Sequence, residues 1–267
     1  MKLRIATYNI HKGVSAFGRR ARIHAIKEAI DLLDADLIFL QEVQGQHDLH
    51  AIRHPHWPGQ SQHDFLAGDS HHSSYGMNAV YDHGHHGNAL LSRYAIAAST
   101  NHDVSDHAYE QRGILHSVIK APAADIHCFV IHLGLFAASR RRQVQALITE
   151  IQNSLPPDAP LIIAGDFNDW RNHLSTSLYE HLGVREVFDD GQHRALHSLL
   201  PLRKNTIKTG RTFPAGLPWL SLDRVYVRGF AVQQAQVLSG APWNKLSDHV
   251  PIVATLEFLA PVISDHA

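Results

Sequence analysis

The stretch Pro160–Trp170, "PLIIAGDFNDW", places an acidic residue, an amide and a second acidic residue directly behind a run of apolar residues. The apolar run is typical of a buried strand, because a short apolar segment bounded by turn residues fits the interior of a sheet. The polar residues behind it have two explanations. They can form a turn, as aspartate and asparagine often do, or the strand can deliver them to a functional site.

The chain has 267 residues, enough for one large domain with a substantial core, and we expect residues 1–267 to form that domain. Lys plus Arg total 24 and Asp plus Glu total 25, for a net charge of -1. This balance excludes a global positive field that would attract polyanions, so any nucleic-acid binding must be local. The one cysteine, Cys128, lies in an apolar run, is expected in the core and excludes an internal disulfide.

The first ten residues, "MKLRIATYNI", alternate like a strand and lack the pattern of a signal peptide. No apolar run is long enough to cross a bilayer, so we expect no transmembrane segment. A single cysteine is compatible with a reducing compartment. These features together favour a cytoplasmic location.

Short strand-like segments alternate with a few helical ones along the chain. Residues 19–34 and 139–155 have the apolar spacing of amphipathic helices, and Ser139 is expected to cap the second. Strands are predicted at Leu3–Ile10, Leu37–Val43, Ala89–Arg93, Ile114–Ile119, Ile126–Leu133, Leu161–Ala164, Leu222–Val227 and Ile252–Phe258. Many short strands with few helices favour packed sheets with helices outside.

Histidine is unusually frequent, with 23 residues in the chain. These residues are densest between His47 and His86, in runs such as "SHHSS" and "DHGHHGN". The segment is rich in Gly, Ser and Asp, which favours long solvated loops. A zinc site is the alternative, although the tight ligand spacing of most zinc sites is missing.

Several other predicted strands also begin or end in polar residues. These are Asn9 and His11, Gln41 and Glu42, His132, Asp166 and Asn168, Asp223, and Asp248 and His249. Each alone can be explained as a cap or turn, but their recurrence at strand ends indicates a site. Asn9, Glu42 and Asp248 offer hard oxygen ligands, which Mg²⁺ and Mn²⁺ prefer. Histidines beside such ligands can move protons or stabilise charge, a combination that hydrolysis of a phosphate ester requires.

Read in order, the motifs between Thr7 and Pro251 resemble those of the endonuclease/exonuclease/phosphatase superfamily, the DNase I-like proteins. They are "TYNIHKG", "LQEV", "GNALLSRY", "QRG", "HLG", "GDFNDW", "LDRVYV" and "SDHVP". "GDFN" followed later by "SDH" is specific, whereas "LQEV" alone is weak. The runs "NIHKG", "GHHGNA" and "RTFP" are most similar to a compact bacterial group of this superfamily.

The resemblance implies a four-layer α/β sandwich, in which two mixed β-sheets pack face to face with helices outside. It also implies a metal site for Mg²⁺ or Mn²⁺ at one edge of the sheets. Glu42 would be the principal metal ligand, with Asn9 beside it and Asp248 completing the site. Asp166 would activate or position the attacking water, and Asn168 would contact the phosphate.

The resemblance also implies roles for histidines. His249 and Asp223 would form a His-Asp pair, and His132 would be a second catalytic histidine. Asn88 in "HHGNA" and Arg112 in "QRG" are candidate substrate-binding residues. An arginine can hold a phosphate oxygen bidentately, although a surface arginine satisfied by water is nearly as good an explanation.

The substrate stays open among phosphate esters, because one fold serves several of them. Nucleic acid is the favoured partner: "RRAR" and "SRRRQ" are locally basic, and Trp219 could stack on a base. Both basic stretches fall on predicted helices, where a solvated face is the ordinary explanation. A phospholipid head group or a small phosphoester is the alternative, with Phe213–Leu220 as a candidate apolar loop. A binding module without catalysis is disfavoured, because every expected catalytic position is filled.

Overall fold

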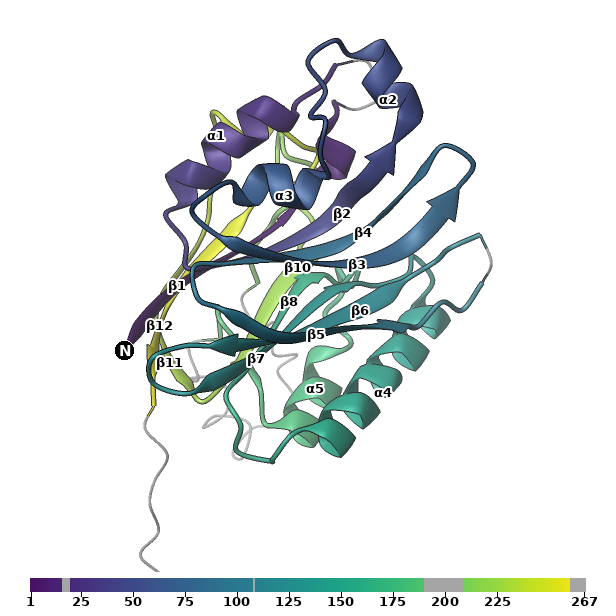
Figure 1. The fold of residues 1–267 in the computed structure, drawn as a ribbon. Helices are drawn as coiled ribbons and strands as arrows, with labels where there is room; N and C mark the ends of the chain where they lie inside the picture. The colour runs from purple at the N-terminus through teal and green to yellow at the C-terminus, as the bar shows by residue number, and fades with distance from the viewer. Residues whose placement is uncertain (16–19, 108, 190–208, 260–267) are drawn as a thin grey trace, which may run out of the picture.

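A computed structural model describes residues 1–15, 20–107, 109–189 and 209–259. Two six-stranded mixed sheets form its centre and pack face to face (Figure 1). The first has the order β11-β12-β1-β2-β4-β3 and the second β5-β6-β7-β8-β10-β9. The strands are β1 Lys2–Asn9, β2 Leu37–His47, β3 His72–Tyr81, β4 Gly84–Ser92, β5 Ile96–Asp103, β6 Gly113–Lys120, β7 Asp125–His132, β8 Leu161–Asp166, β9 Arg185–Glu186, β10 Asp223–Arg228, β11 Phe230–Val237 and β12 Ile252–Phe258.

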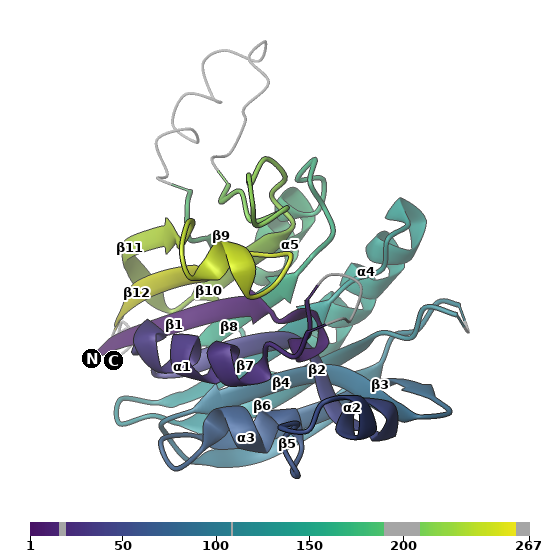
Figure 2. The ribbon, with the colours of Figure 1, turned by 90° about the horizontal axis from the view of Figure 1, so that it is seen from above.

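Helices cover the outer face of each sheet (Figures 1 and 2). They are α1 Ile23–Leu33, α2 Asp48–Arg53, α3 Gln62–Ala67, α4 Ala137–Ser154 and α5 Ser175–Leu182, with short 3-10 turns at His11–Gly13 and Trp243–Lys245. One apolar cluster joins α1 and α3 to the first sheet, a second fills the space between the sheets, and a third joins α4 and α5 to the second sheet. The four-layer α/β sandwich is thus confirmed.

Every strand predicted from the sequence is present, and the two predicted helices correspond to α1 and α4. The assignment of Ser139 as a helix cap is wrong. The helix begins at Ala137 with Phe136 in the cap position, so Ser139 lies inside the first turn. Its buried hydroxyl donates instead to Asp106 Oδ2 at 2.5 Å, which ties α4 to the loop after β5.

The prediction of solvated loops between His47 and His86 is also wrong. This segment contains the last residue of β2, then α2, α3, β3 and the start of β4. Several of its histidines pack as aromatic rings: His47 and His50 stack with centroids 3.7 Å apart, and Trp57 meets His50 edge-on at 4.9 Å. Among the described residues, the clusters able to hold a metal ion contain no side chain from this segment.

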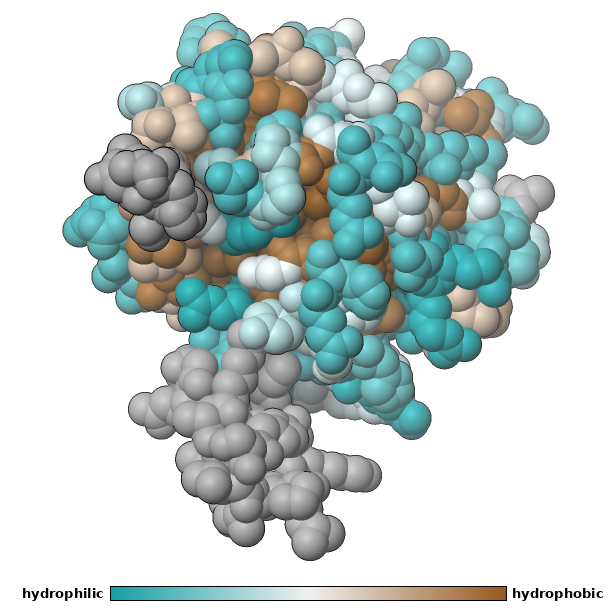
Figure 3. All heavy atoms as spheres, turned by 90° about the horizontal axis from the view of Figure 1, so that it is seen from below, coloured by the Kyte–Doolittle hydropathy of each residue, from teal (hydrophilic) through white to brown (hydrophobic). Residues whose placement is uncertain are grey.

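Cys128 lies in the apolar cluster between the sheets, as predicted. In the described ranges, none of the helices combines the length with the apolar character needed to cross a membrane. The face of the molecule in Figure 3 is largely hydrophilic, with hydrophobic side chains gathered toward its middle.

Candidate active site

The register of the second sheet builds the centre of the site around Asp166, the last residue of β8. Asp166 pairs with His132 across the parallel β7–β8 ladder and with Asp223 across the antiparallel β8–β10 ladder. Residues directly opposite each other on neighbouring strands point to the same face of a sheet. The backbone pairing therefore sets His132, Asp166 and Asp223 in one row, and all three are buried.

His249 reaches this row from the loop before β12. Its Nδ1 donates a hydrogen bond to Asp223 Oδ2 at 2.7 Å, and its Nε2 lies 3.7 Å from Asp166 Oδ2. On the other side of the same oxygen, His132 Nε2 lies at 3.6 Å. Burial disfavours the charged imidazole, but the carboxylates of Asp223 and Asp166 together raise the pKa of His249. The site thus contains a buried, cationic histidine held by a carboxylate.

The first sheet contributes Asn9 and Glu42. The Asn9 amide donates to Glu42 Oε1 at 3.3 Å and to Asp166 Oδ2 at 3.2 Å, so it links the two sheets. Glu42 lies in an irregular part of β2, where the pairing with β4 shifts register between Leu40 and Val43. Its backbone φ is 56°, in the left-handed region that a residue with a Cβ seldom adopts. This local distortion accompanies the placement of a charged residue within an otherwise buried strand.

Left-handed backbone recurs around the site. His11, Lys12 and Asn168 also have positive φ values, of 44°, 59° and 50°. The Asn168 backbone N–H donates to Asp166 Oδ1 at 2.9 Å, which fixes that carboxylate in the turn after β8. Such conformations cost free energy and persist where surrounding contacts enforce them, commonly at functional sites.

The oxygen ligands predicted for a metal lie beside this row. Glu42 Oε2 is buried and accepts no hydrogen bond, although Lys12 Nζ lies 3.2 Å away. Burial opposes ionisation of Glu42, but His132, Lys12 and His11 hold the pKa of its carboxyl far below the usual range. Asp248 is half-buried, and although this burial raises its pKa, a hydrogen bond from His11 and the nearby His249 lower it overall. Two ionised carboxylates suit a hard divalent cation, so these residues fit Mg²⁺ or Mn²⁺. Asn9 faces Glu42 with its amide nitrogen, and its amide oxygen accepts from the His11 backbone N–H at 3.1 Å.

A second grouping of potential ligands overlaps the row itself. One atom each from Asp166, Asp223 and His249 lie within 4.8 Å of one another. The 2.7 Å hydrogen bond already engages His249 and Asp223 with each other. This pair is therefore a candidate proton-handling unit, and Glu42, Asn9 and Asp248 stay the predicted metal ligands.

The residues predicted to bind substrate are held by backbone contacts. A small cavity beside His132 is lined by Asn78, His86, Gly87, Asn88, Gln111, Arg112 and His132. Arg112 donates to Leu133 O at 3.3 Å, and the Asn168 side-chain amide donates to the same oxygen at 2.9 Å. Asn88 donates to two carbonyl groups of the second sheet, and its own carbonyl oxygen is buried without a partner. Binding of substrate by these three residues remains a prediction.

The segment Phe213–Leu220 forms part of the surroundings of His249. The ring of Phe213 lies 5.1 Å from the imidazole, and Phe213 pairs with Leu220 in an isolated bridge. Leu217 is 78% exposed and Trp219 is 61% exposed, so the tip of the loop is not core. The loop that packs Phe213 against His249 therefore also carries an exposed aromatic and an exposed aliphatic side chain.

The basic stretch "SRRRQ" is not a simple solvated face. Arg140 is buried and donates to Leu135 O at 2.6 Å, while Arg142 forms an ion pair with Asp106. Within "RRAR", Arg19 lies outside the described residues and Arg20 is exposed. Arg140 and Arg142 are thus engaged within the protein, whereas Arg141 between them is exposed.

Sequence reasoning missed Lys12 and Tyr8, although both lie within the motif "TYNIHKG". The Tyr8 hydroxyl is buried without a hydrogen-bond partner, and burial and the carboxylates of Asp248 and Asp223 raise its pKa. Lys12 approaches Glu42 because the chain turns sharply through left-handed backbone directly after β1. The glycine that follows, Gly13, was the available signal for such a turn.

The chain is similar to known proteins over almost its whole length. It is 40% identical to the uncharacterised protein YbhP of Escherichia coli over 257 residues, which cover 95% of each chain. A solved endonuclease/exonuclease/phosphatase from Beutenbergia cavernae matches 98% of this chain and 73% of its own, with 19% identity and a TM-score of 0.73. A structure of D. rerio TDP2 complexed with a single-strand DNA product matches 96% of this chain and 99% of its own, with 17% identity and a TM-score of 0.68. The family model of the endonuclease/exonuclease/phosphatase proteins matches residues 6–266, and the chain belongs to that family.

Proposed function

We propose that this member of a phosphoesterase family is a phosphodiesterase that depends on a divalent metal and acts on nucleic acid. The observation that carries the proposal is the row His132–Asp166–Asp223, joined to His249 on one side and to Asn9 and Glu42 on the other. Acid, base and metal-ligating groups thus meet at one edge of both sheets. This is the set of groups that in-line displacement at phosphorus requires.

Each residue has a task that follows from its contacts. Asp166 lies between two histidines and orients the attacking water with the oxygen that both of them approach. His249 is fixed by Asp223, so its Nε2 presents a proton to the phosphoryl oxygens or to the leaving oxygen. His132 supports the same oxygen of Asp166 from the opposite side.

Glu42, Asn9 and Asp248 would hold Mg²⁺ or Mn²⁺, which neutralises charge on the phosphoryl group when bound. Lys12 and His11 lie against the two carboxylates of this set. Each can therefore contact a phosphate oxygen near the same ligands.

Support for nucleic acid comes from the exposed Trp219 on the loop that also packs Phe213 against His249. A base can stack on such a ring, and stacking tolerates any sequence. The TDP2 structure named above was solved with a single-strand DNA product, which agrees with this choice. The alternative is a phospholipid head group, favoured by Leu217 at the same loop tip because an exposed aliphatic side chain can enter a lipid surface.

Activity measurements on a panel of substrates test this proposal. The panel holds single-stranded DNA, RNA, phospholipid vesicles, phosphorylated metabolites and a chromogenic diester, each with Mg²⁺. We expect hydrolysis of nucleic acid that declines steeply with salt, because screening weakens phosphate contacts. Trp219→Ala should lower kcat/KM on single-stranded DNA roughly tenfold, the effect of one lost stacking contact, and leave the chromogenic diester unaffected.

Leu217→Ala is the matched control, since it truncates another exposed side chain of the same loop, two residues away. It should leave cleavage of DNA unchanged. The contrary result would be hydrolysis of phospholipid vesicles with no hydrolysis of nucleic acid, and an equal loss of that lipid activity in both variants. This result would replace the nuclease proposal with the phospholipid alternative.

A further inference from the structure

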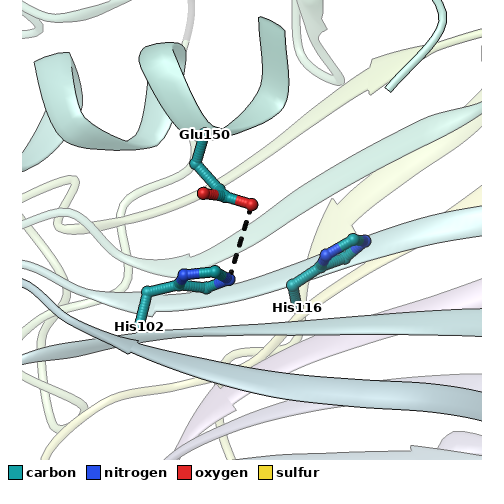
Figure 4. A group of neighbouring side chains, drawn as sticks. All are labelled: His102, His116 and Glu150. Atoms are coloured by element: carbon teal, nitrogen blue, oxygen red, sulfur yellow. Dashed lines mark ion pairs between the residues drawn. The ribbon is translucent and has the colours of Figure 1, made fainter. Parts of the chain in front are cut away.

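A second cluster of metal-ligating side chains lies on the outer face of the second sheet, away from the active site. His102 comes from the edge strand β5, His116 from β6 and Glu150 from α4 (Figure 4). His116 lies opposite Phe129, whose side chain belongs to the apolar cluster beneath α4 and α5. His132 pairs with Asp166, which bonds to Asn9 of the other sheet, so the two sites occupy opposite faces of the second sheet.

The geometry of the cluster is close to that of a metal site. One ligand atom each from His102, His116 and Glu150 lie within 4.8 Å of one another. His102 Nε2 lies 3.6 Å from Glu150 Oε1, and it is buried without a hydrogen-bond partner. Ligands at ~2.1 Å from a tetrahedral ion lie about 3.4 Å apart. Small side-chain rotations that shift the ligand atoms by about 1 Å would therefore complete the site. Figure 4 shows Glu150 reaching from the helix toward the two rings on the strands.

Neighbouring groups hold the ligands in a suitable state. His127 Nδ1 lies 3.0 Å from His116 Nε2. When His116 Nε2 donates in this hydrogen bond, the other nitrogen of His116 has a free lone pair for an ion. Burial and the neighbouring His127 and His102 lower the pKa of His116 to about 4, so its ring is neutral near pH 7. The Ser154 hydroxyl donates to Glu150 Oε1 at 2.6 Å and orients the carboxylate. A metal ion thus meets little competition from protons at the His116 ring.

We propose that His102, His116 and Glu150 form a binding site for Zn²⁺ or a similar transition-metal ion, with His127 as the residue that orients His116. Two imidazoles and one carboxylate are the donors that zinc prefers over magnesium. The ion joins α4 to the edge strand β5 and its neighbour β6. Its role is to stabilise this side of the sheet, because the cluster lies on the face opposite to the catalytic row.

Zinc binding and crystallography test the site in the full-length protein. Crystals soaked in zinc chloride should show an anomalous peak at the zinc edge between His102 and Glu150. The chelator-treated protein should gain thermal stability with zinc, and this gain should be lost in His102→Gln and Glu150→Gln. His127→Ala should weaken zinc binding roughly 10- to 100-fold, as expected for a residue that orients a ligand.

His72→Gln is the matched control, because His72 is an exposed histidine of the other sheet. It should keep the full zinc response, and all four variants should keep wild-type activity in Mg²⁺. An anomalous map without a peak at the cluster would overturn the proposal. So would a zinc-induced stabilisation that His102→Gln and Glu150→Gln leave intact.

Discussion

At the scale of single residues, the proposed catalysis depends on His249 and Asp223 acting together. The imidazole is fixed by a 2.7 Å hydrogen bond to Asp223, and the backbone of Asp223 is held in turn because its N–H donates to Thr212 Oγ1 at 3.3 Å. A histidine held this way has one tautomer and a favoured cationic form. Its Nε2 is therefore directed at the oxygen of Asp166.

Replacing His249 tests this pair. His249→Ala should lower turnover by roughly two to four orders of magnitude, the effect of a lost acid-base group, with folding near normal. Asp223→Asn should lower it less, and the double variant should be little worse than His249→Ala alone, because the two residues act as a unit. Steady-state kinetics with His72→Ala as control provide the measurement. Losses that multiply independently, or an active His249→Ala protein, would transfer the proton-handling role to His132.

Sequence reasoning located the site residues that are polar and stand at or near the ends of predicted strands. Asp166 and His249 were predicted from "GDFN" and "SDH", and the structure places them 3.7 Å apart. Lys12 could not be predicted as a neighbour of Glu42, because its position depends on a left-handed turn and on a register shift in another strand. Such backbone irregularities have no side-chain periodicity to reveal them.

At the scale of elements, the strands that sequence reasoning missed are β3, β5, β9 and β11, and these form the four edges of the two sheets. An edge strand is paired on one side only and is more exposed, so its sequence is more polar and its alternation weaker. β5, "IAASTNHD", is an example in which most side chains are exposed or half-buried. The central strands were predicted because both of their faces are covered and their sequences are continuously apolar.

Gly165 shows how an element positions the site. Its φ is 147°, and a Cβ added there would lie 2.0 Å from the carbonyl oxygen of Ile131 in the neighbouring strand. Gly165→Ala should therefore destabilise the fold by roughly 1–3 kcal/mol and displace Asp166, with a large loss of activity. Gly59→Ala, where the added carbon meets nothing within 4 Å, should change stability by less than about 0.5 kcal/mol. Denaturant unfolding measures both, and equal stability of the two variants would contradict this role of the glycine.

At the scale of the whole molecule, the two sheets divide the chemistry between them. The first sheet and its loops supply Asn9, Glu42 and Asp248, and the second supplies His132, Asp166 and Asp223. The hydrogen bond from Asn9 to Asp166 joins the halves. Because neither sheet holds all of these residues, the site exists only in the folded sandwich. Its assembly could be predicted from the sequence only through the order of the family's motifs.

The most direct test of the central claim is the rate of hydrolysis of a chromogenic phosphodiester as a function of Mn²⁺ concentration after chelation. We compare the wild type with Glu42→Ala and Asp166→Ala. The wild type should be inactive in chelator and recover with Mg²⁺ or Mn²⁺. Glu42→Ala should recover in part at higher Mn²⁺, because it has lost a metal ligand, and Asp166→Ala should not recover, because it has lost the residue that orients water. Full activity of the wild type in chelator, or equal recovery of both variants, would contradict the account.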